Sequence, residues 1–126
     1  MHNIIVLNGH EFVTKVAITE QEQMKGLMFE KWPPPIMVFP YKNSSVRKFW
    51  MHNTISPLDI IFCNSGKIIS IMKGEPLSTK LIGPDSLIDF VIELPYGMAK
   101  LLTLKPGDDI TFSPTEATLK SILRSR

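Results

Sequence analysis

Apolar and polar residues alternate over short stretches along most of this chain, which is the pattern of β-strands with one buried face. Glycine, proline, asparagine and serine, the residues that favour turns, stand between these stretches. The pattern predicts strands at residues 4–7, 12–18, 36–39, 46–51, 58–63, 67–72, 87–94 and 109–113.

Two of the predicted turns carry clear local signals. Asn8-Gly9 indicates a tight hairpin, because both residues tolerate the positive φ angles that such a turn needs. Asn64-Ser65-Gly66 predicts a second hairpin, with a three-residue loop. We expect residues 41–45 to be a turn as well. Residues 49–62 should form a strand–turn–strand whose polar tip closes one end of an apolar core.

Two short helices are expected. Thr19 and Glu22 have the spacing of a capping box, and Gly26 suits the end of the helix that they begin. Near the C-terminus, Leu119, Ile122 and Leu123 recur at helical spacing, with basic residues facing elsewhere. The chain should therefore consist of a single β-rich domain over residues 1–113 and an appended amphipathic helix over residues 114–126.

Short strands at spacings near ten residues favour a sheet that curls on itself. The fold class predicted is mainly β (α+β). We expect an antiparallel β-barrel or half-barrel of short strands, with one short helix near residues 20–26 and a C-terminal helix.

Composition narrows the function classes only slightly. The chain has 126 residues, one cysteine and a net charge of +2, so it fits one domain without an internal disulfide. So small a charge does not favour nucleic acid as a partner. The apolar run at residues 4–7 is too short for a signal peptide or a membrane span, so a cytoplasmic protein is expected.

Several motifs together resemble a known family. The central one is Phe49-Trp50-Met51-His52-Asn53-Thr54 followed by Pro57-Leu58-Asp59-Ile60-Ile61-Phe62. The others, in order, are Val16-Ala17-Ile18-Thr19, Gly26-Leu27-Met28-Phe29, Met37-Val38-Phe39-Pro40, Val91-Ile92-Glu93-Leu94-Pro95, Gly97 and Gly107-Asp108. On these residues the chain resembles the bacterial and archaeal family catalogued as domain of unknown function 192.

The resemblance implies a compact β-rich domain with a small helix and assigns no reaction. Two positions depart from the family pattern: Glu30 stands where arginine is common, and His52 stands where lysine is common. The segment from Pro114 onward extends beyond the usual domain. If the two basic residues serve a ligand in the family, that ligand is changed or lost here.

The candidate ligand-binding residues gather around the central motif. Each also has a purely structural interpretation. Asn53 and Thr54 can shape a loop, Trp50 can cover the end of the core, and Asp59 can accept bonds from loop amides or pair with Arg47 or Lys48. The candidates are Trp50, His52, Asn53, Thr54, Asp59 and Glu93.

Carboxylates offer the one catalytic hypothesis. Asp59 and Glu93 could act as an acid–base pair across a cleft, and Asp89 lies on the same predicted strand face as Glu93. Solvent-exposed strand faces carry such charges routinely. No known catalytic motif is present, and the histidines and Cys63 lack the spacing of metal ligands.

We therefore expect a non-catalytic domain that binds an unknown small ligand or a protein, with no cofactor and no metal. The alternatives are a hydrolase-like enzyme with dispersed carboxylates, or a nucleic-acid or protein adaptor acting through basic surface and the C-terminal helix. Neither a membrane nor a nucleic-acid partner is favoured, and the protein is expected to be a monomer or a weak dimer.

Overall fold

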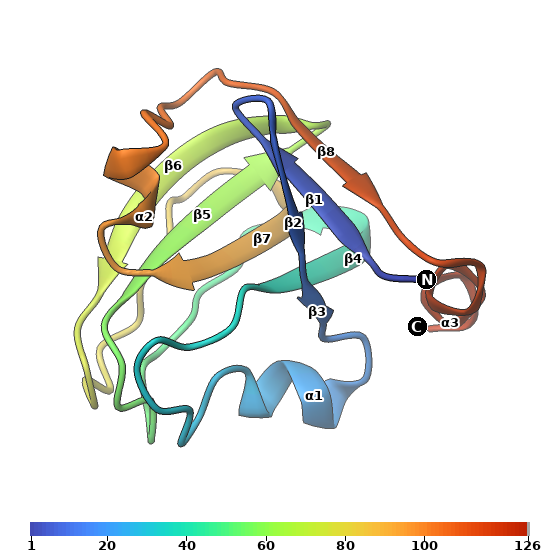
Figure 1. The fold of residues 1–126 in the computed structure, drawn as a ribbon. Helices are drawn as coiled ribbons and strands as arrows, with labels where there is room; N and C mark the ends of the chain where they lie inside the picture. The colour runs from blue at the N-terminus through green and yellow to red at the C-terminus, as the bar shows by residue number, and fades with distance from the viewer. Residues whose placement is uncertain (126) are drawn as a thin grey trace.

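A computed structural model describes residues 1–125 of the chain, and Figure 1 shows a β-rich body with short helices around it. The strands are β1 (Ile4–Leu7), β2 (His10–Val13), β3 (Lys15–Val16), β4 (Met37–Ser45), β5 (Leu58–Asn64), β6 (Lys67–Gly74), β7 (Ile88–Pro95) and β8 (Ile110–Ser113). The helices are α1 (Glu20–Lys25), α2 (Met98–Leu101) and α3 (Glu116–Arg124).

The strands form two sheets, one with the order β2-β1-β8 and one with the order β3-β4-β7-β5-β6. All pairings are antiparallel except that of β3 with β4. An isolated bridge between Lys67 and Asp109 connects the two sheets at one corner. The predicted fold class is confirmed: the described residues form a mainly β half-barrel without full closure.

Strand β7 lies in the middle of the larger sheet, and the sheet has an apolar core on each face. One core joins the two sheets, with Ile61 and Ile92 packed against Ile5 and Leu7. The other core contains Phe39, Phe62 and Val91 and is covered by loops and by the residues around α1 (Ala17, Leu27, Phe49, Met51, Ile82). Both faces of β7 are therefore buried, which sequence alternation alone did not indicate.

The local signals in the sequence are confirmed at two hairpins and one helix. Asn8 and Gly9 have φ angles of 49° and 79° in the β1–β2 turn. Thr19 caps α1, with Glu22 completing the box, and Gly26 ends the helix at φ 48°. The β5–β6 hairpin is also present, but Asn64 pairs with Lys67, so its loop has two residues instead of three.

Two predicted elements are wrong. Residues 46–51 form no strand; their only ladder-like contact is the isolated bridge between Phe49 and Ile82. The strand–turn–strand over residues 49–62 is therefore irregular in its first arm. Residues 41–45 belong to β4, which runs on to Ser45 and is not a turn. Alternation at 46–51 arises because the segment lies across the sheet and buries Met51, and not because it pairs with a neighbouring strand.

Helix α3 follows β8 and stands beside the body of the protein (Figure 1). Its N-cap is Thr115, whose hydroxyl accepts a hydrogen bond from Thr118. Leu119 and Leu123 are exposed on it. No helix in residues 1–125 is long and apolar enough to span a lipid bilayer.

Candidate functional site

A cavity of about 460 Å³ opens on one face of the larger sheet, the face that does not pack against the three-stranded β2-β1-β8 sheet. Helix α1 and the residues after it form one side, and the segment that follows β4 forms the other. The cavity is lined by Glu20, Gln23, Met24, Lys25, Gly26, Leu27, Met28, Phe39, Tyr41, Lys48, Phe49, Trp50, Thr54, Leu81 and Glu93. This volume is within the usual range for small-ligand sites.

Glu93 is the buried acidic group of this cavity. It is only 4% exposed and sits on β7 between Met37 of β4 and Ile60 of β5. Its carboxyl group makes no hydrogen bond within residues 1–125, and burial raises its pKa from 4.5 to about 8. Because no fully occluded polar side-chain atom in these residues lacks a partner, the carboxyl oxygens of Glu93 remain reachable.

Gly26 brings the backbone close to this carboxyl group. It has a φ of 48°, which disfavours side chains, and a Cβ placed there would lie 3.6 Å from Oε1 of Glu93 and 3.5 Å from Phe39. The glycine that ends α1 therefore also keeps the space above Glu93 open.

Two cationic side chains near the cavity, Arg47 and Lys48, bind groups other than Glu93. The guanidinium of Arg47 lies 3.5 Å from the ring centroid of Tyr41 and donates to the carbonyl oxygens of Asn43 and Ile88. Lys48 donates to Gly83, Pro84 and Asp85. Neither forms an ion pair with Glu93.

Tyr41 supplies a second polar group at the cavity. Desolvation raises its pKa to about 12, against the opposing charge of Arg47 and with a smaller contribution from Glu93. Its phenol therefore stays neutral at physiological pH. Tyr41 and the largely protonated Glu93 thus line the same cavity as a set of apolar and aromatic side chains, together with polar residues of α1, Lys48 and Thr54.

Aromatic rings form much of that wall. Phe39 and Phe49 meet edge to face, with ring centroids 5.0 Å apart, and Phe49 meets Phe62 in the same way at 5.8 Å. Such edge-to-face packing favours fixed positions of the rings. Trp50, Met24 and Leu81 extend the apolar surface outward and are themselves exposed.

The structure brings together three of the six residues predicted from sequence. Trp50, Thr54 and Glu93 line the cavity. His52 and Asn53 do not line it: the ring of His52 lies 4.9 Å from that of Trp50, and Asn53 occupies a left-handed turn whose carbonyl accepts from Phe29. Thr54 also has a structural role, since its hydroxyl donates to the carbonyl of His52.

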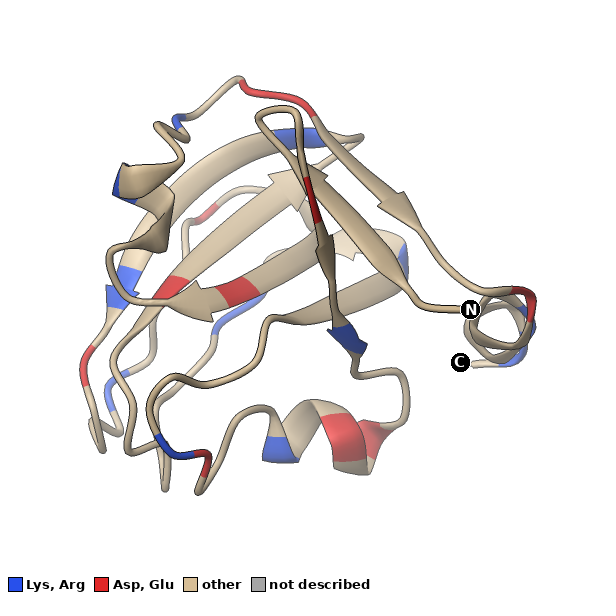
Figure 2. Ribbon diagram, viewed as in Figure 1, with Lys and Arg blue, Asp and Glu red and all other residues tan. Residues whose placement is uncertain are grey.

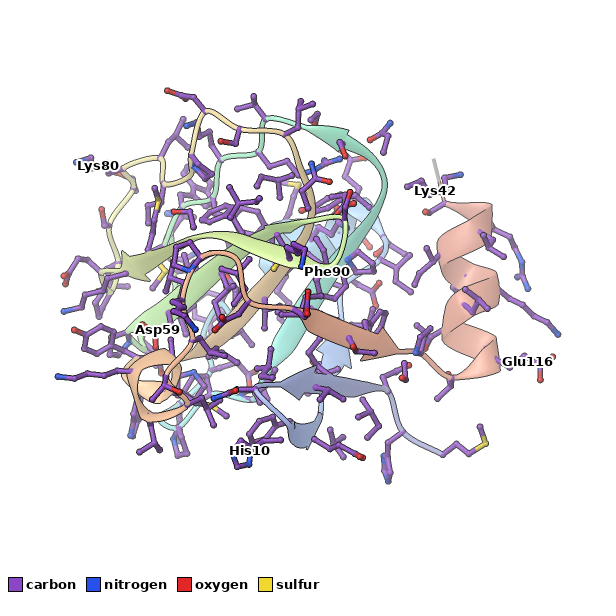
Figure 3. All side chains as sticks on the ribbon, turned by 90° about the horizontal axis from the view of Figure 1, so that it is seen from above. His10, Lys42, Asp59, Lys80, Phe90 and Glu116 are labelled. Atoms are coloured by element: carbon purple, nitrogen blue, oxygen red, sulfur yellow. The ribbon has the colours of Figure 1, made fainter. Side chains whose placement is uncertain are left out.

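Asp59 lies on the opposite face of the sheet. It is opposite Leu94 in the β5–β7 register, whereas Glu93 is opposite Ile60, so the two carboxyl groups point away from each other. Oδ2 of Asp59 accepts from the amides of Gly97 and Ala99, 3.0 and 2.9 Å away, beside α2 as Figure 3 shows. The predicted acid–base pair across one cleft is therefore wrong.

Asp89 is not part of that cavity either. Its carboxylate accepts from the amide of Ser65 in the β5–β6 turn. Within residues 1–125, no three histidine, cysteine, aspartate or glutamate side chains gather in a way that could hold a metal ion.

Sequence reasoning did not select Gly26, Phe39 or Tyr41 as site residues. Gly26 and Phe39 belong to stretches that carry the family resemblance, which was the available signal for them. Tyr41 was assigned to a turn, so its place on the cavity wall was hidden. A second, more open hollow of about 480 Å³ lies at Lys31, Trp32, Ile55, Ser56, Pro57 and Tyr96 and contains no buried charged group.

Comparison with known proteins supports the family resemblance that the sequence motifs indicate. The DUF192 family model, described as Uncharacterized ACR, matches residues 3–112. The chain is 28% identical over 113 residues to UPF0127 protein TK1120 of Thermococcus kodakarensis, which covers 86% of this chain and 69% of that protein.

Two solved structures have the same fold at a TM-score of 0.78. One is a protein of unknown function from Novosphingobium aromaticivorans, 31% identical, with 87% of this chain and 83% of that chain covered. The other is a proposed transcription regulator from Sinorhizobium meliloti, 27% identical, with 88% of this chain and 92% of that chain covered.

Proposed function

Since the chain belongs to DUF192, a family of unknown function, we propose a role from the cavity itself: a non-catalytic domain that binds a small ligand above Glu93. The observation that supports it is a buried carboxyl group with no hydrogen bond in residues 1–125, at the floor of a cavity of about 460 Å³. Leaving such a group without a partner costs stability. A ligand that supplies the partner would recover that cost.

The candidate contacts from the predicted set are Trp50, Thr54 and Glu93, and we add Tyr41 and Phe39 from the cavity wall. Asp59 has another role, because two backbone amides already occupy its carboxylate. The proposal therefore keeps half of the predicted residues and replaces the rest with neighbours in space.

An enzyme is less well supported than a binding domain. Hydrolysis by two carboxylates needs both on one cleft, and the β5–β7 register places Asp59 and Glu93 on opposite faces. A nucleic-acid adaptor is not favoured either, because lysine and arginine are spread over several elements and do not form one basic face on the ribbon (Figure 2).

The test is a fragment screen by two-dimensional NMR on the full chain. We expect amide shifts to cluster at Gly26, Tyr41 and Thr54, which come from different segments and meet only at this cavity. Met24→Trp should block the mouth, since Met24 is 66% exposed on α1 and its replacement leaves the core intact. Binding should weaken about tenfold or more.

The matched control is Leu101→Trp. Leu101 is 82% exposed on α2 and does not line the cavity, so the same bulky residue there should leave fragment binding unchanged. Shifts confined to other parts of the chain, or binding that Met24→Trp does not weaken, would contradict the proposed function.

A further inference from the structure

We infer that the ligand of this cavity is a small organic cation, a primary ammonium on a compact apolar body, which places its charge on Glu93. This inference rests on the proposed function and names the chemical class of its ligand. Three features of the described residues support it: a carboxyl group without a counter-ion, walls of aromatic rings, and a mouth formed by apolar side chains.

The charge balance around Glu93 is the first argument. Lys25 and Lys48 line the cavity and Arg47 precedes Lys48 in the chain, and none of the three forms an ion pair with Glu93. Arg47 and Lys48 donate instead to carbonyl oxygens and to Asp85. An ammonium group at the floor would provide the counter-ion that the chain itself withholds. An anionic ligand would leave Glu93 protonated and would bring its own negative charge, without a counter-ion at the carboxyl group, into a desolvated space at a high cost.

The aromatic wall is the second argument. Phe39, Tyr41, Phe49 and Trp50 all line the cavity, and the ring faces of such residues attract cations. This chain already uses that interaction at one of these rings, since the guanidinium of Arg47, which does not line the cavity, lies 3.5 Å from the ring centroid of Tyr41. A neutral alcohol would gain the apolar contacts but neither the ion pair nor the attraction to the rings.

The mouth of the cavity is consistent with a cationic head that enters first. Met24, Trp50 and Leu81 are exposed there and can cover an apolar body. Glu20 and Lys25 of α1 also lie at the cavity, with opposite charges, so helix α1 presents no net charge to the ligand.

Binding of an ammonium ion should release a proton. Burial raises the pKa of Glu93 to about 8, so the group is mostly protonated at pH 6 and must ionise to pair with the cation. The other titratable groups that face the cavity are Tyr41 from β4, Lys48 from the following segment, and Glu20 and Lys25 from α1. Tyr41, with a pKa of about 12, stays neutral over this range.

Isothermal titration calorimetry with the full chain tests the inference. The probes are matched pairs of amine and alcohol: butylamine with butanol, benzylamine with benzyl alcohol, and phenethylamine with 2-phenylethanol. At least one amine should bind more tightly than its alcohol at pH 8. Its affinity should fall about tenfold for each pH unit below that, with about one proton released at pH 6 in buffers of different ionisation enthalpy.

Two variants identify the carboxyl group responsible. Glu93→Gln keeps the shape of the side chain and should weaken the amine about tenfold or more, while the alcohol changes little. Glu20→Gln removes an exposed carboxylate from the same cavity and should leave the proton release intact. Circular dichroism confirms that each variant is folded before titration. The Met24→Trp variant, which does not touch Glu93, provides a second block on binding.

The outcomes separate the two proposals. If neutral fragments bind at the cavity but no amine outcompetes its alcohol, or if the released proton persists in Glu93→Gln, the cation inference is overturned and the proposed function stands. If nothing binds at Gly26, Tyr41 and Thr54, the proposed function itself fails. Amine preference with a proton release that depends on Glu93 supports both.

Discussion

Each face of the larger sheet buries one carboxyl group, and the two groups differ in their hydrogen bonds. Asp59 and Glu93 come from adjacent strands, one step apart in register, and are 6% and 4% exposed. Two backbone amides of residues 97 and 99 donate to Asp59. No group in residues 1–125 donates to Glu93, which faces a cavity instead.

The difference teaches how to separate a structural acid from a candidate binding group. Burial is the same at both positions, so burial alone does not distinguish them. What differs is whether the chain supplies the hydrogen-bond donors. Asp59 accepts hydrogen bonds that fix the start of α2 at the end of the sheet. Glu93 makes no hydrogen bond in residues 1–125, so no interaction within these residues offsets the cost of its desolvation.

The largest effect should come from neutralising Glu93. Its pKa is raised in the folded protein from 4.5 to about 8, so the folded state holds a proton that the unfolded state releases. Stability should therefore fall as pH rises between these values, by about 1.4 kcal/mol for each pH unit, and then level off above pH 8. Glu93→Gln should remove this slope and exceed the wild type in stability at pH 8.

Urea unfolding of wild type and Glu93→Gln from pH 4.5 to pH 9 measures this. The difference between the two free energies of unfolding should grow steadily and then become constant. A constant difference throughout would mean that Glu93 titrates normally, and the contrast between the two faces would disappear.

The second effect concerns the other face. Asp59→Ala should destabilise the protein by roughly 3 kcal/mol, because the amides of Gly97 and Ala99 lose their acceptor inside the structure. Asp109→Ala is the matched control. Asp109 pairs with Lys67 on the surface, so this substitution should lower the free energy of unfolding much less. Denaturant unfolding at pH 7 compares them. Equal losses would show that Asp59 has no special structural role.

The local part of the fold could be predicted because its causes lie close together in the chain. The Asn8-Gly9 turn and the Thr19–Glu22 capping box each depend on residues within three positions of each other. The segment at 46–51 failed for the opposite reason: its alternation reflects burial against the sheet, and its bridge partner, Ile82, is far away in sequence.

The site was predictable only in part, for the same reason. Glu93 could be named from its strand, but its lack of donors depends on Gly26, Tyr41 and Arg47, which come from three other segments. The donors of Asp59 are about 40 residues away from it, so its structural role was one of two open interpretations. Tertiary contacts therefore decide which of the two carboxyl groups receives hydrogen bonds from the chain.

The smallest expected effect concerns helix α1, which lies at the cavity above Glu93 on one face of the sheet. Thr19 caps α1, which lines the cavity, and Thr115 caps α3, which does not. Thr19→Ala and Thr115→Ala should each cost about 1 kcal/mol, because each removes an acceptor from a helix N-terminus. Only Thr19→Ala should also weaken fragment binding, since fraying of α1 displaces Met24 and Gly26 from the mouth. Thermal unfolding and NMR titration of both variants measure the two effects separately. Equal weakening of binding by both would mean that overall stability, and not the position of α1, controls access to Glu93.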